Sequence, residues 1–513
     1  MKKEIWLTGV MIASVLIAAC TASSTDIGEI EATDEAIALY YPNLRAGDHT
    51  LDIAYRMAVG DLFTNIQQYK SLYSGKVVPV LIAGVDYNTP WIRDASINAW
   101  SGGSLLVPEV AKNTLLSVLN EYEDGTLRPK GQYWDAVIWI SGAWNHYLVT
   151  GDREFLQVAF RVARDMLTYY EDTEFNAVYG LFRGLGWSDG VAAYPAKYAN
   201  TGMQSGAFLW PEYNQDKVSQ PGFGIPMMAI STNALYYNAY RVTGKMARVL
   251  DEEGQEEWNT KAAALKEAIN RHLWNENTGV YSFYIDEEGT CELQEALGNA
   301  YAMMFGITDD QQAASIFRNQ YVSPHGVTCG WPELPRFQTD PDGMSFGRHN
   351  VTVWPQIQGM WADVAARYGK VEVFTHELQA LAANAVRDMQ FSEIYHPVTG
   401  ERYGGMQANG QEIGLWESTR RQTWSATAYL RMVYSGLFGI VLEEGGLRFS
   451  PVLPEGIGPV SLNGLKYRNM LLNITVSGEG TEITSFKVDG KEQDAPLIPA
   501  TGQGKLLVEI EVK

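Results

Sequence analysis

The chain has 513 residues, of which 46% are hydrophobic and 12% aromatic, and its formal net charge is −21 at pH 7. This composition indicates a globular protein with a large core, and the length allows one large domain with a small one, or two to three average domains. Lys and Arg form no basic run. We therefore expect neither nucleic acid nor an anionic membrane surface as a partner, because both need a cationic protein face.

The N-terminus has the pattern of a secretory signal. Two lysines, Lys2 and Lys3, precede an apolar run over residues 5–19 that is too short for a comfortable transmembrane helix. The run ends at Ile17-Ala18-Ala19-Cys20, which resembles the bacterial lipobox, whose cysteine carries lipid. We predict a lipoprotein signal peptide at 1–20, lipidation of Cys20, a tether and lead-in at 21–47, and anchoring in the bacterial cell envelope, facing the periplasm or the exterior. An ordinary cleaved signal is the alternative.

Two further cysteines, Cys291 and Cys329, remain once Cys20 is set aside. In an oxidising compartment they could pair. Two separate buried thiols are favoured, because a core of this size needs no covalent link.

Residues 48–438 are predicted to be mainly helical. A helix begins at Pro108, and another over 133–149 ends at Thr150-Gly151 and is followed by a partner helix to about residue 170. The succession recurs at 230–242, where Thr243-Gly244 is expected to end the helix before a partner that ends near 274. A third pair spans 353–389, with its break at Gly369-Lys370, and short hairpins follow the first two pairs at 176–180 and 278–281. The units differ in length and exceed solenoid repeats, so a closed ring of helical hairpins is favoured over a solenoid.

Residues 439–513 have a different character. Short apolar runs over 447–451, 471–476 and 506–512 are separated by Gly, Pro and Asn, which is typical of strands joined by turns. We predict a small antiparallel β-sandwich as a second domain.

The first candidate for chemistry is Glu393, in the segment Ser392-Glu393-Ile394-Tyr395-His396-Pro397-Val398-Thr399-Gly400. Its carboxylate lies between two aromatic residues at the start of a sharp turn. A sugar can stack on aromatic rings while a carboxylate activates a water molecule. The alternative is a surface glutamate beside a tight loop.

The second candidate is Asp189, in Gly186-Trp187-Ser188-Asp189-Gly190. This segment also matches G-x-S-x-G, but a serine nucleophile needs that motif on a strand–turn–helix of a parallel sheet, and the surrounding pattern predicts none. Asp189 lies in a long aromatic loop like that of Glu393. The two carboxylates could converge as acid and base for glycoside hydrolysis. Metal-binding motifs are absent from the sequence, and the seven His residues are scattered.

Several segments, in order along the chain, resemble those of the (α/α)6 six-hairpin glycoside hydrolases. This group includes amylo-α-1,6-glucosidases, trehalases, mannosyl-oligosaccharide glucosidases and mannosylglycerate hydrolases. The similar segments are Pro90-Trp91-Ile92-Arg93-Asp94, Tyr133-Trp134-Asp135-Ala136-Val137-Ile138-Trp139 with Thr150-Gly151-Asp152, Trp187-Ser188-Asp189, His349-Asn350-Val351-Thr352-Val353-Trp354-Pro355, Glu393 to Gly400, and Gln422-Thr423-Trp424-Ser425-Ala426.

The resemblance implies a mainly α fold, an (α/α)6 barrel over 48–438 with the β-sandwich behind it. It implies that Asp189 is the general acid and Glu393 the general base, and that no cofactor is needed because the chemistry is proton transfer. The substrate-binding residues implied are Trp91, Arg93, Asp94, Asp135, Trp187, His349, Trp354 and Tyr395. The chain departs from the trehalase and glucosidase branches in having no Glu before Asp189 in residues 184–189, so their substrates do not transfer directly.

Together these features predict an inverting, exo-acting glycoside hydrolase that removes a terminal, α-linked, glucose-like sugar from an oligosaccharide or polysaccharide. One alternative is a glycan-binding lipoprotein without catalysis. Another is a sugar isomerase or epimerase on the same fold, with His349 and His396 as acid and base. For single residues, Arg93 and Asp94 could be a structural ion pair, Asp135 a charge favoured by a helix dipole, and the tryptophans part of the core.

Overall fold

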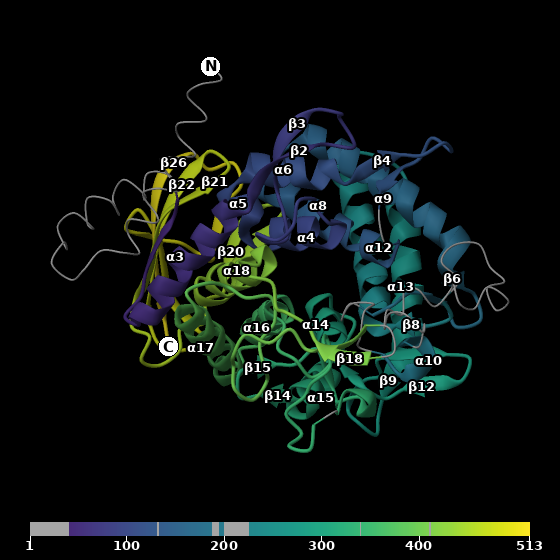
Figure 1. The fold of residues 1–513 in the computed structure, drawn as a ribbon. Coiled ribbons are helices and arrows are strands. Elements are labelled where there is room, and N and C mark those ends of the chain that lie inside the picture. The colour runs from purple at the N-terminus through teal and green to yellow at the C-terminus, as the bar shows by residue number, and fades with distance from the viewer. Residues whose placement is uncertain (1–40, 131–132, 187–193, 200–224, 339, 410–411) are drawn as a thin grey trace.

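The computed structural model describes residues 41–130, 133–186, 194–199, 225–338, 340–409 and 412–513. Cys20, and with it the signal peptide and most of the lead-in, lies outside these ranges. Helices form most of the molecule, and the strands that follow residue 440 form sheets against one side of it (Figure 1). The described part is therefore mainly helical with a C-terminal sheet region, as predicted.

Six helices pack against one another in succession. They are α4 (Ile92–Asn98), α8 (Ile138–Thr150), α12 (Ile230–Leu250), α14 (Ala296–Met304), α16 (Pro355–Arg367) and α18 (Thr423–Arg431). Each contacts the next, and α18 also contacts α4, so that the succession returns to its start. Most of their residues are buried. Figure 1 shows these helices arranged about a common centre.

Other helices cover this inner set and bury one face each. They are α3 (His49–Thr64), α6 (Pro108–Ser117), α9 (Arg153–Glu174), α13 (Gln255–Leu273), α15 (Asp310–Asn319) and α17 (Val371–Asp388). Helix α9 packs on α8 and α12, α13 on α12, and α17 on α16 and α3. Their amphipathic sequences fit this position, since one stripe faces the core and the other faces solvent.

The break between α8 and α9 forms where the sequence predicts it. Gly151 adopts a left-handed conformation (φ 71°) that ends α8, and the Asp152 carboxylate accepts the Phe155 N–H as the N-cap of α9. Upstream, a short helix α7 (Tyr133–Ala136) precedes α8. The hairpins predicted after the helix pairs are also present, as β6 (Phe175–Asn176) with β7 (Leu181–Phe182) and β9 (Trp274–Asn275) with β10 (Val280–Tyr281).

The predicted end of a helix at Thr243-Gly244 is wrong, because α12 continues to Leu250. The Thr243 hydroxyl donates to the Ala239 carbonyl inside the helix, so the residue is satisfied without a break. A Cβ at Gly244 would lie only 3.4–3.5 Å from atoms of α13, which indicates that the glycine serves close helix packing. The helix ends instead at Asp251, in the left-handed region (φ 60°).

The C-terminal strands form two sheets. The larger has the order β1 (Asn43–Arg45), β21 (Val460–Tyr467), β22 (Met470–Gly478), β26 (Gly504–Val512), β23 (Ile483–Val488) and β24 (Lys491–Glu492), and the smaller is β19 (Ile440–Glu443), β20 (Gly446–Phe449) and β25 (Leu497–Pro499). The predicted strands are present, but the sheet is not purely antiparallel, because β22 and β26 run parallel. The intervening strands provide the long crossover that a parallel pair needs. Strand β1 comes from the predicted lead-in and pairs with β21.

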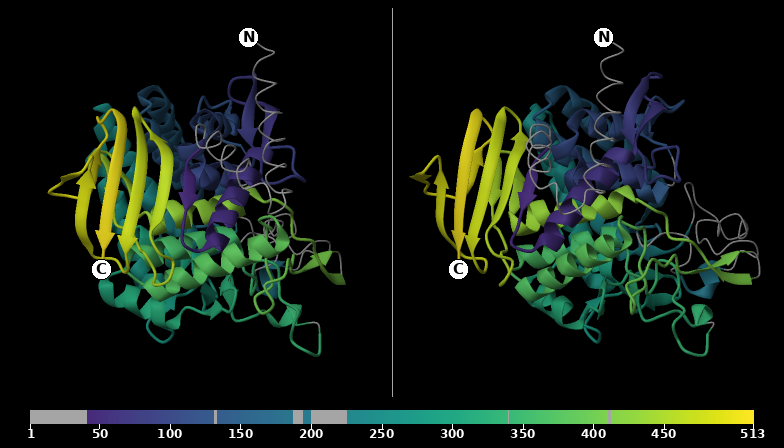
Figure 2. Two further views of the ribbon diagram at one scale, coloured as in Figure 1. Left: turned by 90° about the vertical axis from the view of Figure 1, so that its left-hand side faces the viewer. Right: turned by 60° about the vertical axis from the view of Figure 1, so that its left-hand side comes forward.

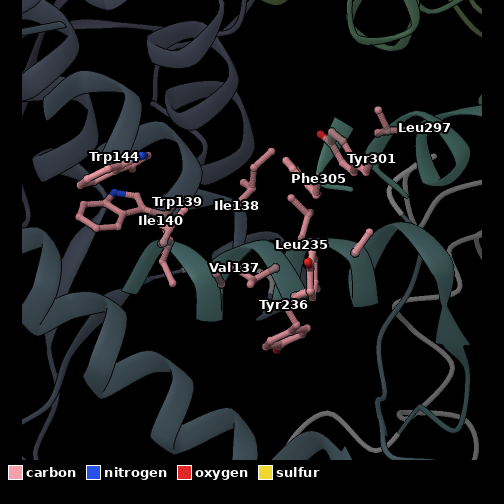
Figure 3. Close-up of a cluster of buried hydrophobic side chains, with 14 of the residues drawn as sticks. Val137, Ile138, Trp139, Ile140, Trp144, Leu235, Tyr236, Leu297, Tyr301 and Phe305 are labelled. Atoms are coloured by element: carbon pink, nitrogen blue, oxygen red, sulfur yellow. The ribbon is translucent and has the colours of Figure 1, made fainter. Parts of the chain in front are cut away.

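The sheet packs on the helical part through one hydrophobic cluster. Strand β22 alternates buried and half-buried residues, and Ile474 joins Leu51 of α3, Leu378 of α17 and Tyr429 of α18 in that cluster. Figure 2 shows the large sheet lying along the side of the helices. A second cluster fills the space between α8, α12 and α14, and Figure 3 shows part of it, including Trp139.

The two other cysteines are free thiols, with Cys329 buried and Cys291 half-buried. This agrees with the favoured prediction of separate thiols. Within the described ranges, we find no helix whose length and apolar character would let it cross a membrane.

Candidate active site

Glu393 lies in the segment between α17 and α18, and its side chain is 4% exposed. Its Oε1 accepts a hydrogen bond from Nη2 of Arg348 at 2.8 Å, and its Oε2 accepts the Thr419 N–H at 3.1 Å. The backbone N–H of Glu393 donates to the Thr419 carbonyl. The alternative of a solvated surface glutamate is therefore wrong. The carboxylate is buried and held from two sides.

Arg93 and Asp135 form a buried, two-pronged ion pair. Nε and Nη2 of the guanidinium donate to the two carboxylate oxygens at 3.0 and 3.1 Å. Arg93 is in the first turn of α4, and Asp135 is in α7, just before α8. The structure thus brings together two predicted substrate-binding residues, and the ion pair of Arg93 is with Asp135 rather than with its neighbour Asp94.

Asp94 is fully buried beside this pair. Burial raises the pKa of its carboxyl well above the usual range; the Arg93 charge opposes this, and the negative charges of Asp135 and Glu393 add to it. Within the described residues, its Oδ1 has no hydrogen-bond partner. Burial therefore favours the protonated form of Asp94, which is the form that can donate a hydrogen bond.

Tyr87 belongs to the same group and was missed by the sequence analysis. Burial raises the pKa of its hydroxyl, and the charges of Glu393 and Asp94 raise it further, which requires the ring to lie near both carboxyls. The sequence could have indicated Tyr87, because Asp86-Tyr87-Asn88 comes just before the Pro90-Trp91 segment. Trp91 itself, the N-cap of α4, is 44% exposed and offers a free ring surface.

His349 and Trp354 are stacked on each other, with ring centroids 4.2 Å apart, and both are buried. Trp354 also meets the edge of Trp424 at 4.9 Å. The backbone of Val353 exchanges two hydrogen bonds with that of Tyr395, so the predicted V-W-P segment lies directly beside the Glu393 segment.

Tyr395 is fully buried, and its hydroxyl accepts the Ser392 N–H at 2.9 Å. The observed role of the ring is to pack the Glu393 turn against the core, and sugar stacking on it stays a prediction. His396 uses both ring nitrogens on the backbone: Nδ1 accepts from Val398 and Thr399, and Nε2 faces the Met344 carbonyl at 3.1 Å. That engagement disfavours His396 as an acid or base of an isomerase.

Asp189 and Trp187 lie outside the described residues. The described residue before them, Gly186, packs tightly, since a Cβ there would lie 2.9 Å from Oε1 of Glu295 and 2.3 Å from the Phe283 ring. Glu295 is buried and accepts from the Ser231 hydroxyl at 2.7 Å. Glu295 is a second residue that the sequence analysis missed. Its position directly before the apolar helix α14 (Ala296–Met304) could have indicated it.

These side chains share one end of the inner helices. Arg93 is near the start of α4, Glu295 is the N-cap of α14, and Trp354 is the N-cap of α16. Amino ends of helices favour negative charge, which suits a site rich in carboxyl groups. Within the described ranges, no group of three or more His, Cys, Asp or Glu side chains has a geometry that could hold a metal ion.

Comparison with known proteins gives two family matches. Residues 122–425 match the mannosylglycerate hydrolase MGH1-like glycoside hydrolase domain, and residues 441–495 match the C-terminal domain of glycosyl hydrolase family 65. The periplasmic trehalases of Xanthomonas oryzae pv. oryzae and Xanthomonas axonopodis pv. citri are each 25% identical over 189 residues. Those alignments cover 35% of this chain and 31% of each trehalase, so the match extends over about a third of the curated relatives' length.

Solved structures with the same fold fall into two groups by coverage. The alignment with a sialidase covers 95% of this chain and 44% of the sialidase chain, with a TM-score of 0.66 and 15% identity. The alignment with the GH78 rhamnosidase of Bacillus sp. GL1 covers 92% of this chain and 44% of the rhamnosidase chain, with a TM-score of 0.59 and 13% identity. The alignment with the GH63 mannosylglycerate hydrolase of Thermus thermophilus in complex with glucose covers 74% of this chain and 99% of the hydrolase chain, with a TM-score of 0.53 and 16% identity. At these identities the likeness is one of fold.

Proposed function

This chain belongs to the family of mannosylglycerate hydrolase MGH1-like glycoside hydrolases, and on that premise we propose that it is an inverting, exo-acting enzyme that removes a terminal, α-linked, glucose-like sugar from an oligosaccharide or polysaccharide. The family assignment confirms the predicted resemblance to six-hairpin glycosidases and makes the chain a glycoside hydrolase. It favours hydrolysis over the glycan-binding and isomerase alternatives. The sugar, the linkage and the stereochemistry are the proposed part.

The observation that carries the proposal is the buried carboxylate of Glu393, held by Arg348 and the Thr419 N–H. In the proposed reaction, Glu393 takes a proton from a water molecule while the water oxygen attacks the anomeric carbon. Asp189 gives its proton to the glycosidic oxygen, so the bond to the leaving group breaks as the bond to water forms. Inversion needs space for that water, with carboxyl groups ~6.5–9.5 Å apart.

The neighbouring residues would hold the terminal sugar. Arg93 and Asp135 offer a donor and an acceptor to sugar hydroxyls, and the buried Asp94 carboxyl offers a further hydrogen-bonding group. Trp91 and Trp187 would provide stacking surfaces at the entrance, and His349, Trp354 and Tyr395 would support the subsite from behind. Proton transfer alone supplies the chemistry, so we propose no cofactor.

We also propose the (α/α)6 barrel over 48–438 and the β-sandwich over 439–513. The succession of six inner helices that returns from α18 to α4 supports the barrel. The family 65 C-terminal match at 441–495 and the two sheets support the second domain.

For localisation we propose the cell envelope, with a lipid on Cys20. The matched trehalases are named periplasmic, which supports this position. Metabolic labelling with an alkyne-bearing fatty acid tests it: the wild type should take up label and Cys20→Ala should not, whereas equal labelling of both would contradict lipidation at this residue.

The experiment for activity compares wild type, Glu393→Gln and Glu401→Gln on a panel of aryl and natural α-glycosides. Glu401 is exposed in the same turn and serves as the matched control. We expect Glu393→Gln to lose about 10²–10⁴ in kcat/KM, the usual contribution of a general base, and Glu401→Gln to match wild type. No sugar release by wild type would support the glycan-binding alternative, and turnover of free sugar without hydrolysis would support the isomerase.

Asp189 is tested with the same panel. Asp189→Asn should lose much of its activity on natural glycosides and much less on aryl glycosides whose leaving group needs no proton. An equal loss on both classes would contradict its role as general acid.

A further inference from the structure

A cavity of about 270 Å³ lies at the opposite end of the inner helices from Glu393. It is lined by residues in the later parts of these helices, such as Lys245 of α12, Met304 of α14 and Arg367 of α16, and by Ile440 to Leu442 of strand β19. The site residues described above lie at the helix starts. Helix α14 has 9 residues, so its own two ends are ~13 Å apart along the axis.

Cationic side chains line this cavity in a protein of net charge −21. They are Arg241, Lys245, Arg367 and Arg431, and no carboxylate is among the described residues that line it. Arg367 and Arg431 share the single carboxylate of Asp363 behind the wall. The two arginines hold the pKa of that carboxyl at about 2 against the effect of its burial. The two arginines and the one carboxylate of Asp363 therefore carry a net charge of +1.

Lys245 and Arg241 add further positive charge. Arg241 donates to the Phe305 carbonyl, which is a neutral partner, and no carboxylate among the described residues pairs with it. Within the same ranges, the Lys245 ammonium has no hydrogen bond or ion pair. Burial lowers its pKa, and the Arg241 charge lowers it further. The nearest carboxylates are engaged elsewhere, since Glu443 pairs with Arg448 and Glu444 with Arg248.

The remaining wall is aromatic. Trp100 is stacked on Phe305 with ring centroids 6.1 Å apart, and Arg431 lies over the Trp100 ring at 4.6 Å. Trp144 and Tyr434 also line the cavity. Arg241 and Lys245 are half-buried, so an anion between them would gain from two partly desolvated positive groups. Aromatic walls favour a compact organic body over a bare inorganic ion.

We propose that this cavity, between the helical part and strand β19, is a second binding site that takes a small organic anion. Its carboxylate or phosphate group lies between Lys245 and Arg241, and its body lies against Trp100 and Trp144. The site is separate from the Glu393 region and needs no glycosidase chemistry.

The test is isothermal titration calorimetry on the full chain with two matched pairs of probes. Succinate is compared with succinamide, and glycerol phosphate with glycerol, so that each anion has a neutral partner and the carboxylate and phosphate sources are separated. We expect at least one anion to bind at least about tenfold more tightly than its neutral partner, in a manner weakened by salt. Equal affinity within both pairs, or no binding by any of the four probes, would overturn the proposal.

Variants locate the binding. Lys245→Met removes the charge at similar length and should weaken the anion by about tenfold or more, whereas Lys245→Arg keeps the charge and should largely preserve binding. Lys505→Met, exposed on β26, is the matched control and should bind as wild type. Glu393→Gln should also bind as wild type. Undiminished binding by Lys245→Met, or loss of binding in Glu393→Gln, would place the anion elsewhere and overturn the proposal.

Discussion

Nη2 of Arg348 donates to Oε1 of Glu393 at 2.8 Å across a buried contact between segments 45 residues apart. The same guanidinium donates from Nη1 to the Gly404 carbonyl, and this second hydrogen bond fixes its orientation toward the carboxylate. A guanidinium held in this way fixes the position of the Glu393 carboxylate, and catalysis by a general base depends on that position.

Replacing Arg348 by Met should lower kcat/KM. Oε1 of Glu393 then loses the hydrogen bond that holds it, and the carboxylate can leave the position that a general base needs. Initial rates on one aryl glycoside measure this. Arg402→Met, exposed in the neighbouring turn, is the control. An unchanged kcat/KM in Arg348→Met would show that the ion pair does not position the base.

A methyl group at Gly405 should disturb the same ion pair indirectly. Gly405 has φ 82°, and a Cβ there would come within 2.4 Å of the Arg348 Cα, which is backbone and cannot easily give way. Gly405→Ala should lower both the melting temperature and kcat/KM. Gly414→Ala, where no atom lies within 4 Å of the new Cβ, should change neither. Thermal unfolding and initial rates of the two variants check this, and equal behaviour would contradict it.

Asp61 connects helix α3 to the segments around Glu393, because its carboxylate accepts from the Phe391 N–H and from Nη1 of Arg421. Burial raises its pKa from the ordinary value of 3.8 to about 6, even though those two donors lower it. Between about pH 4 and 6 the folded chain then holds more protons than the unfolded chain. The contribution of this group to stability is present below pH 4 and is lost as the pH rises through 6, by about 3 kcal/mol.

The check is the pH dependence of the free energy of unfolding in wild type and Asp61→Asn. The difference between the two should decline from pH 4 to pH 7. Asp342→Asn, at an exposed position, is the control. A wild-type curve parallel to that of Asp61→Asn would show that Asp61 titrates as usual.

The pair of Arg93 and Asp135 should be strongly coupled in stability. Both side chains are about 5% exposed, so removing one partner leaves a buried charge without its counterpart, at a cost of about 3–5 kcal/mol. Removing both as Arg93→Met with Asp135→Leu should cost clearly less than the sum of the single changes. Urea unfolding of the four proteins measures the coupling, and additive losses would contradict it.

Local signals predicted much of the fold, and non-local packing accounts for what they missed. Gly151 and Asp152 mark a helix junction by their own chemistry, so the sequence revealed it. Thr243 and Gly244 resemble such a junction, but α13 packs on them and the helix continues. The parallel pairing of β22 with β26 depends on which strands meet, and no local pattern specifies that.

The candidate site divides in the same way. Arg93, Asp135 and Glu393 belong to segments with a recognisable pattern, and the structure brings them into one buried region. Tyr87 and Glu295 stand in segments without such a pattern, and only the folded arrangement places them near the carboxyls or beside Gly186. The counter-charge of Glu393 was likewise hidden, since Arg348 precedes a segment noted for His349 and Trp354.

The most direct measurement of the central claim is the anomer of the first product, followed by proton NMR in the first minutes of hydrolysis of an α-glycoside. If Glu393 activates water opposite the leaving group, the β-anomer appears first and the α-anomer grows only by mutarotation. The α-anomer as first product would mean retention of configuration, and would contradict Glu393 as the base of an inverting enzyme.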